Sequence, residues 1–444
     1  MMRNLNVKIY YFIFFITLPL ITWAAPPPVN LSLKKAVDAV LTNNPSLQSL
    51  REKVRQIELN SSATNSILYP TIESVTTAYQ KKDSVGNGSA NFDGNSYNQY
   101  TTSVKLTQTI FKIGAFAALS SAQKNVELGK LDADIGSRNL MSAVITGYYQ
   151  IVLNSKDVET LLHQQRLTKE SLKVAEQRAR IGRGQVLDVL QIKTQLALLE
   201  STIDEAKTKL QISIANLAFL MGDPNEQSIR INSSLDVPNI EDIDRAIDLK
   251  KYRIFELEKT ELVLNQIEDS KRIAYGQNLP YLSLVGEYNF TTYKKDTLFD
   301  PLYNSWYLGI QLTIPIFSGF TSIYQQKQLS SQRIQLELNK KYDESSVRYQ
   351  QLTSRKNLET AHNSISSGTD ALKLSIDSLN EAKKNYKYAM IDFLHLLTVQ
   401  KDYVTAEQTL NKKKFDYITA LTTYFVSSGQ DLNRLTALLE RRNP

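Results

Sequence analysis

The sequence predicts a mainly α-helical protein with a small β part, built as a tandem duplication of one unit. Long stretches carry apolar side chains at seven-residue spacing, which indicates coiled-coil helices. Two shorter stretches, near residues 71–111 and 281–317, alternate apolar and polar residues as β-hairpins do. The same order of elements recurs at an offset of about 206 to 213 residues. Periodicity and repetition together therefore define the fold class.

The N-terminus has the features of a secretory signal peptide. Arg3 and Lys8 precede an apolar run over residues 9–21, and small residues follow at Ala24 and Ala25. We expect residues 1–24 to be the signal peptide, with cleavage near Ala24. A membrane anchor is the alternative, and Pro19 and the shortness of the run disfavour it. The chain has no cysteine, so lipidation of this segment is excluded and the mature protein is expected to be exported without a lipid anchor.

The composition argues against several classes of function. The net charge of +7 is spread along the chain without a basic block, so no nucleic-acid partner is expected. The three histidines, His163, His362 and His395, lack metal-ligand spacing. The glycines form no phosphate-binding pattern. We therefore expect no enzyme activity, no metal and no cofactor.

The first repeat is predicted to span residues 25–225. Helices are expected over about 30–41 and 47–67, separated by a break at Asn43-Asn-Pro45 in which Asn44 or Ser46 caps the second helix. A β-hairpin with a long polar loop over 81–96 follows at about 71–111. A helical hairpin over about 114–221 completes the unit and turns at its tip, about 180–185.

The helical hairpin of this repeat has two further signals. Its returning helix has two rows of mostly apolar residues at heptad spacing, as in a coiled coil. The rows are Val189, Leu196, Ile203, Leu210 and Leu217, and Ile192, Leu199, Ala206, Ser213 and Leu220. In the outgoing helix, small residues recur every seventh position, at Ala122, Gly129, Gly136 and Ala143. Glycine costs about 1 kcal/mol inside a helix, so we expect a neighbouring helix to approach closely there.

The second repeat is predicted over residues 226–428. A linker leads to a helix over about 240–276, then to a β-hairpin over about 281–317 and a helical hairpin over about 319–428 with its tip at about 387–393. Residues 313–317 match 107–111, and the returning helix again carries heptad stripes. The stripes are Leu396/Leu397, Tyr403/Val404, Leu410/Asn411, Tyr417/Ile418 and Tyr424/Phe425. Residues 429–444 are expected to form a C-terminal tail.

The second β-hairpin alternates strictly. One face is apolar, with Leu282, Leu284, Gly286, Tyr288 and Phe290 on one strand and Trp306, Leu308, Ile310, Leu312 and Ile314 on the other. This pattern is typical of transmembrane β-barrels, and also of an amphipathic hairpin on a soluble core. Four strands per chain cannot close a barrel, for which about eight is the minimum. If the strands span a membrane, several chains must share one barrel, and a homotrimer with a 12-strand β-barrel continued by an α-helical barrel satisfies this.

The residues resemble a known family, the TolC-like outer-membrane factors of efflux pumps and type I secretion. The resemblance covers essentially the whole mature chain. It rests on the duplication, on Tyr69-Pro70 and Leu279-Pro280 before the hairpins, on Pro315-Ile-Phe-Ser-Gly319, and on the turn sequence of residues 180–190. It implies a trimer in the cell outer membrane with a large periplasmic portion. The trimer would contact outer-membrane lipid, bind a periplasmic adaptor protein and carry substrates from an inner-membrane transporter to the exterior.

The resemblance also implies roles for individual residues. The adaptor-contacting periplasmic tips would contain Arg180, Gly182, Arg183, Gly184, Asp188, Ala389 and Met390. Gly182 matches the family's turn glycine, whereas Ala389 stands where the second tip should have one. His395 and Thr398 stand where many members have acids at the pore constriction. A histidine there suggests the hypothesis that closure depends on pH, because imidazole changes charge near physiological pH.

A different class of protein is a periplasmic coiled-coil adaptor or structural spacer without a pore. It explains the signal peptide and the helical hairpins, but it does not explain two alternating β-hairpins at matching places in the two repeats. The leading interpretation is therefore an outer-membrane exit duct, with the non-pore adaptor or spacer as the alternative.

Overall fold

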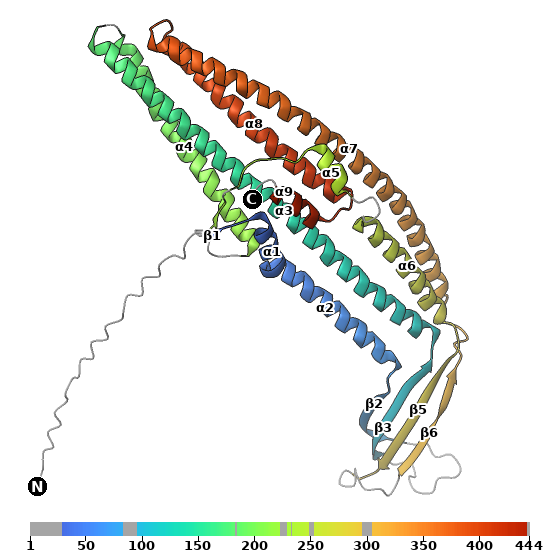
Figure 1. Ribbon diagram of the computed structural model, residues 1–444. Helices are drawn as coiled ribbons and strands as arrows, with labels where there is room; N and C mark the ends of the chain where they lie inside the picture. The colour runs from blue at the N-terminus through green and yellow to red at the C-terminus, as the bar shows by residue number, and fades with distance from the viewer. Residues whose placement is uncertain are drawn as a thin grey trace, which may run out of the picture.

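The computed structural model describes residues 29–82, 96–182, 184–222, 229–231, 233–247, 253–294 and 304–441. Two long helical hairpins lie side by side, and a sheet stands at the end opposite their tips (Figure 1). The first hairpin is α3 (Ile113–Arg180) and α4 (Val186–Met221). The second is α7 (Thr321–Lys387) and α8 (Phe393–Ser427). At about 1.5 Å per residue, the 68 residues of α3 form a rod of about 100 Å.

Each hairpin is closed by the predicted heptad stripes. In α4 the residues Ile192, Leu199, Ile203 and Leu217 are at most 3% exposed, and α4 packs on α3. In α8 the buried residues include Leu396, Tyr403, Tyr417 and Phe425. Because α3 also contacts α8, the helices form one layer in the order α4, α3, α8, α7. The coiled-coil prediction is confirmed within each hairpin.

The sheet-side half of this layer is completed by two shorter helices. These are α2 (Pro45–Asn65), which packs on α3, and α6 (Phe255–Gly276), which packs on α3 and α7. A side chain at Gly129 or Gly136 would collide with Ile57 or Leu50 of α2. The close helix approach that these glycines predict is therefore confirmed, and its partner is α2.

The elements before the first hairpin follow the predicted order. The helix α1 (Leu33–Asn43) is followed directly by α2, and Asn44 caps α2 by accepting hydrogen bonds from Ser46 N at 2.8 Å and Leu47 N at 3.1 Å. A short 3-10 turn, η1 (Ser66–Leu68), then leads into the sheet. The proposed signal peptide, residues 1–24, lies outside the described residues.

The sheet is antiparallel, with the strand order β2-β3-β5-β6. Its strands are β2 (Thr71–Lys81), β3 (Tyr97–Phe111), β5 (Tyr281–Thr292) and β6 (Asn304–Thr313). Both predicted β-hairpins are therefore present, and β3 and β5 join them into one sheet. The last strand ends at Thr313. Residues 314–316, which were predicted to continue it, lie outside the strand. The polar loops over 83–95 and 295–303 lie outside the described residues.

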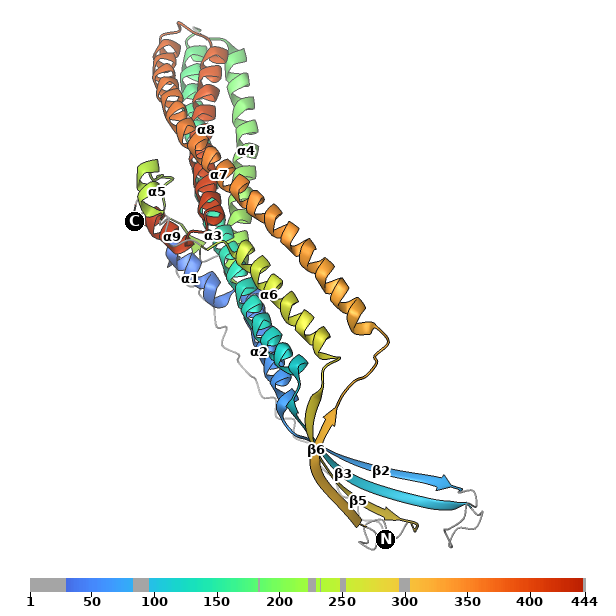
Figure 2. The same cartoon turned by 90° about the vertical axis from the view of Figure 1, so that its right-hand side faces the viewer.

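A small cap lies halfway along the rods (Figure 2). It consists of α1, α5 (Ile240–Ala246), α9 (Leu432–Glu440) and a parallel pair, β1 (Val29–Asn30) with β4 (Ile229–Arg230). The buried residues Val40, Ile243 and Leu435 join α3, α4 and α8 in the main apolar core. The cap thus links the first and last described parts of the chain to both repeats.

Two predictions about this region are wrong. The expected single helix over 240–276 is two helices, since α5 ends at Ala246 and α6 begins at Phe255. The expected tail over 429–444 contains α9, whose Leu432, Leu435 and Leu439 are at most 2% exposed. The short helices α5 and α9 each bury an apolar side in the cap. A helix of seven to nine residues is too short for its apolar spacing to reveal this packing in the sequence.

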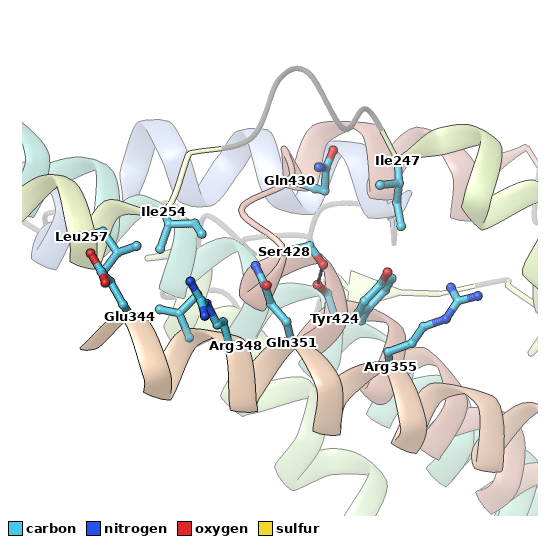
Figure 3. Close-up of a pocket in the computed structure, with 11 residues that line it drawn as sticks. Ile247, Ile254, Leu257, Glu344, Arg348, Gln351, Arg355, Tyr424, Ser428 and Gln430 are labelled. Atoms are coloured by element: carbon cyan, nitrogen blue, oxygen red, sulfur yellow. Dashed lines mark hydrogen bonds between the residues drawn. The ribbon is translucent and has the colours of Figure 1, made fainter. Parts of the chain in front are cut away.

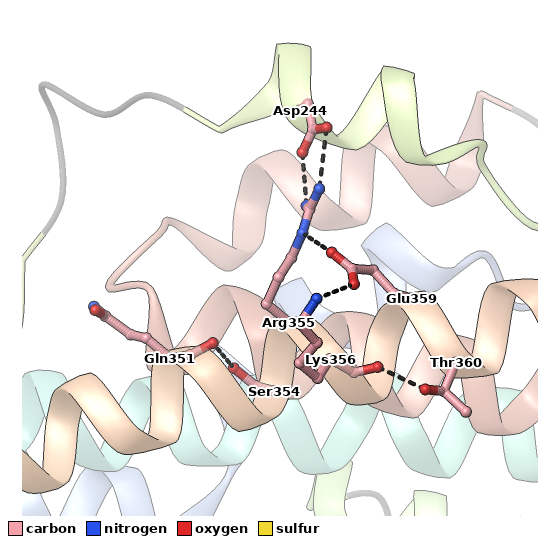
Figure 4. Close-up of polar contacts among 7 residues, drawn as sticks. All are labelled: Asp244, Gln351, Ser354, Arg355, Lys356, Glu359 and Thr360. Atoms are coloured by element: carbon pink, nitrogen blue, oxygen red, sulfur yellow. Dashed lines mark hydrogen bonds and ion pairs between the residues drawn. The ribbon is translucent and has the colours of Figure 1, made fainter.

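An arginine fixes α5 to the rods (Figure 4). The guanidinium of Arg355, on α7, donates to both carboxylate oxygens of Asp244 at 2.7 and 3.3 Å and to Glu359 at 3.1 Å. These hydrogen bonds, chiefly the one to Asp244, raise the pKa of Arg355 above its usual range. This bidentate contact holds α5, and the cap through it, against α7.

Candidate functional site: sheet faces and helical tips

The sheet has one apolar and one polar face. On the apolar face, Leu282, Leu284, Gly286 and Tyr288 of β5 pair with Leu312, Ile310, Leu308 and Trp306 of β6, as the sequence pattern predicts. In the single chain these β6 side chains are 58 to 73% exposed. The polar face carries threonine, serine, asparagine and glutamine together with four charged residues, Glu73, Lys81, Lys105 and Glu287. A sheet with an apolar outer face and a polar inner face is the arrangement of a membrane channel wall.

The first helical tip is a tight turn between α3 and α4. Gly182 adopts the left-handed conformation with φ +71°, which glycine enters without steric cost. Arg180 is exposed at the end of α3, and Asp188 is half-buried in the first turn of α4, where a carboxylate is favourable. Gly184 lies against the backbone of Ala179, and Arg183 lies outside the described residues. The structure therefore brings the described residues of the predicted group together at one end of the rod.

The second tip has the same backbone shape with a different residue. Ala389 has φ +63°, the left-handed conformation that Gly182 adopts in the first tip. Met390 follows and is 71% exposed. The side chain of Asp392 caps α8 by accepting a hydrogen bond from His395 N at 2.8 Å. The turn geometry of the duplication is thus retained although its glycine is not.

The two residues predicted near a constriction lie on the first turns of α8. Both His395 and Thr398 are exposed in the single chain, and Thr398 Oγ1 donates to Leu394 O at 3.0 Å. Their side chains therefore face away from the packed seam between the two hairpins.

A contact that sequence reasoning missed links the two tips. The guanidinium of Arg178, on α3, lies 4.8 Å from the ring centroid of Tyr386, on α7, and its Nη2 donates to the backbone oxygen of Tyr386. Tyr386 is 3% exposed and packs edge-on against Phe393. Burial raises the pKa of the Tyr386 hydroxyl, Arg178 opposes this and Asp188 adds to it. The available sequence signal was an arginine and a tyrosine next to matching turns of the two repeats.

One recess lies away from the sheet and the tips. A hollow of about 540 Å³ opens beside α7, lined by Arg348, Gln351, Tyr424 and Gln430 among others (Figure 3). Its lining contains neither histidine nor cysteine. Among the described residues, no three histidine, cysteine or acidic side chains are grouped as metal ligands would be.

No helix in the described part of the chain is both long enough and apolar enough to cross a bilayer.

The fold places an amphipathic sheet at one end of the molecule and two helical tips at the other, which is the arrangement expected of an outer-membrane channel protein. Comparison with known proteins agrees with this class. A family model described as "Outer membrane efflux protein" matches residues 36–223. The alkaline protease secretion protein AprF of Pseudomonas aeruginosa is 21% identical over 349 residues, which is 73% of this chain and 68% of the relative.

Solved structures share the fold over nearly the whole chain. The CmeC outer membrane channel of Campylobacter jejuni superposes with a TM-score of 0.77 at 16% identity, covering 99% of this chain and 98% of that one. VceC, an outer membrane protein of Vibrio cholerae, gives 0.76 at 14% identity, covering 90% and 96%. Residues 36–223 therefore match the outer membrane efflux protein family, and the whole chain shares the fold of outer-membrane channels, in agreement with the resemblance to the TolC-like outer-membrane factors.

Proposed function

We propose that this chain is one third of a homotrimeric exit duct in the cell outer membrane. The duct passes substrates from an inner-membrane transporter and a periplasmic adaptor to the exterior, in a tripartite efflux pump or a type I secretion system. One observation carries the proposal, namely a four-stranded sheet with an apolar exposed face and with β2 and β6 as its edge strands. Edge strands are not tolerated in lipid, and four strands are too few to close a barrel. Three copies supply twelve strands.

The helical layer supports the same assembly. Its outer helices α4 and α7 carry large exposed apolar side chains, as the edge strands do. On α7 these include Leu338, Tyr342 and Tyr349, which are 60 to 74% exposed, and on α4 they include Ile212 and Phe219, at 63 and 77%. Apolar stripes of this kind are typical of interfaces. Pairing α7 of one copy with α2 and α4 of the next would close the helical layer along its whole length.

The tips are then the periplasmic end of the duct. Arg180, Gly182, Asp188, Ala389 and Met390 lie there together, and exposed apolar groups such as Met390 suit an adaptor surface. In this proposal, adaptor contact shifts an equilibrium between closed and open tips.

The first test measures the mass of the detergent-extracted complex by native mass spectrometry. The proposal predicts three mature chains in a species that fractionates with outer membranes and resists carbonate extraction. A monomer, or a protein absent from the membrane fraction, would contradict it and favour the non-pore adaptor or spacer.

A matched pair of variants on one strand tests the orientation of the sheet. Ile310 lies on the apolar face of β6 and Gln311, its neighbour, on the polar face. A lysine on a lipid-facing strand position costs about 2–4 kcal/mol at mid-bilayer. Ile310→Lys should therefore abolish the membrane-inserted trimer, while Gln311→Lys should leave it intact. Equal tolerance of the two substitutions would show that the apolar face does not meet lipid.

A further inference from the structure

Apart from Lys81 at the loop end of β2, the charged side chains of the described strands lie in one row across β2, β3 and β5. Glu73 of β2 is the direct partner of Lys105 of β3, and Lys105 is the partner of Glu287 of β5. Glu287 is opposite Tyr307 of β6, whose hydroxyl lies 3.0 Å from a Glu287 carboxylate oxygen. Direct cross-strand neighbours are about 4.5–5.5 Å apart at Cβ, so the charges of the row lie at one level of the sheet.

The rest of the sheet makes this row distinctive. Strand residues of the polar face are otherwise neutral over the described part of the sheet, except for Lys81 at the loop end of β2. On the apolar face, the described strand residues include no acid and no lysine or arginine. The sheet therefore concentrates its charge at one level.

The row is not electrically balanced. Two carboxylates face one ammonium, so each chain contributes one net negative charge at neutral pH. Opposite-charge pairs between strands stabilise a sheet by about 0.2–1 kcal/mol each, and Glu73 with Lys105 would suffice for that. The second carboxylate, Glu287, is held by the Tyr307 hydroxyl and leaves the row negative.

We propose that the row Glu73–Lys105–Glu287–Tyr307 is a charge-selecting belt of the duct, which favours cations over anions where the path crosses the outer membrane. This inference rests on the proposed function, because three copies around a lumen repeat the row into a closed belt. Rings of charged side chains set ion selectivity in channels, and low-dielectric walls concentrate their field. The belt is set by the sheet and is independent of the helical tips.

The test is the reversal potential of single channels in planar bilayers under a KCl gradient of about 10 to 100 mM, where the Debye length is about 10–30 Å. Wild type should prefer K⁺ over Cl⁻. Glu73→Gln combined with Glu287→Gln makes the row net positive, so the preference should reverse. Lys105→Gln makes it more negative and should shift the potential the opposite way.

The opposite signs separate selectivity from sheet stability, because both changes remove the neighbouring opposite charges of the row. Both shifts should vanish near 1 M salt, where the Debye length falls to about 3 Å. Glu241→Gln, which removes a carboxylate 87% exposed on α5, is the matched control and should conduct like wild type. If the double variant does not assemble, Lys105→Gln carries the test alone.

Conducting variants with the wild-type reversal potential would overturn the belt and leave the duct standing. A wild-type protein that forms no channel would overturn the duct, and the belt with it.

Discussion

Arg178 and Tyr386 join the two helical hairpins of one chain at their tips. The arginine approaches from α3 and stacks on a tyrosine ring of α7 at 4.8 Å, while also donating to the tyrosine's backbone oxygen. Since Tyr386 is nearly fully buried, this contact has a fixed geometry. A rearrangement that separates the second hairpin from the first must break it.

Removing this contact should favour the open tip. Arg178→Ala loses a cation–π contact of about 1–2 kcal/mol and a charge-assisted hydrogen bond. We expect a higher open probability in planar bilayers, by about tenfold or more for a loss above 1.4 kcal/mol. Arg166→Ala, at an exposed position of the same helix, is the matched control. Unchanged gating in Arg178→Ala would mean that the contact only packs the tip.

The two tip turns should respond oppositely to exchange of glycine and alanine. Gly182 and Ala389 share the left-handed backbone, which costs a residue with a Cβ roughly 1–2 kcal/mol. No atom lies within 4 Å of a Cβ built on Gly182, so Gly182→Ala should destabilise without a steric clash, by the backbone strain less the unfolded-state entropy term. Ala389→Gly should stabilise by about 0.5–1 kcal/mol, because the gain in unfolded-state entropy offsets part of the relief. Chemical unfolding of the two variants measures both signs, and a destabilised Ala389→Gly would contradict the account.

Glu256 at the start of α6 gives a prediction for acid. Burial by itself would raise the pKa of the Glu256 carboxyl. A hydrogen bond from Arg138 at 2.6 Å, a hydrogen bond from the backbone of Glu256 and the positive charge of Arg138 together lower this pKa below 4.5. A lowered pKa in the folded protein gives stability that is present above the unfolded value and is lost as pH falls through the folded one. Because the side chain is half exposed, the contribution is below about 1 kcal/mol.

We therefore expect Glu256→Gln to be less stable than wild type at pH 6 to 8, with the difference shrinking as the pH falls below about 4.5. Thermal unfolding over this range measures it. A difference that grew towards acid pH would show that the sign of the pKa shift is wrong.

The hypothesis that closure of the tips depends on pH rests on His395. Its ring is exposed at the first turn of α8. Protonation would put three positive charges near the tips of a trimer and should favour opening by repulsion. Single-channel recordings of wild type and His395→Gln from about pH 5.5 to 8 test this. Identical profiles would assign the residue to the surface only.

Local periodicity explains how much of this protein could be predicted from its sequence. Heptad rows such as Ile192, Leu199 and Ala206 mark a buried helix face, because a coiled-coil partner lies over every seventh residue. Alternation in β5 and β6 marks two faces because successive strand residues point to opposite sides. Gly182 indicates the tip turn because glycine adopts the left-handed conformation of that turn without steric cost. The sequence alone therefore predicts the long helices, the strands, the tip turns and the duplication, and its motifs carry the resemblance to the family.

Only the tertiary structure decided which segments meet across the repeats. The Arg178–Tyr386 contact joins residues 208 positions apart, and the pairing of Lys105 with Glu287 depends on the register between β3 and β5. The docking of α9 into the cap and the break between α5 and α6 likewise depend on partners distant in sequence. Register and docking are properties of two surfaces at once, so no period within one segment can specify them.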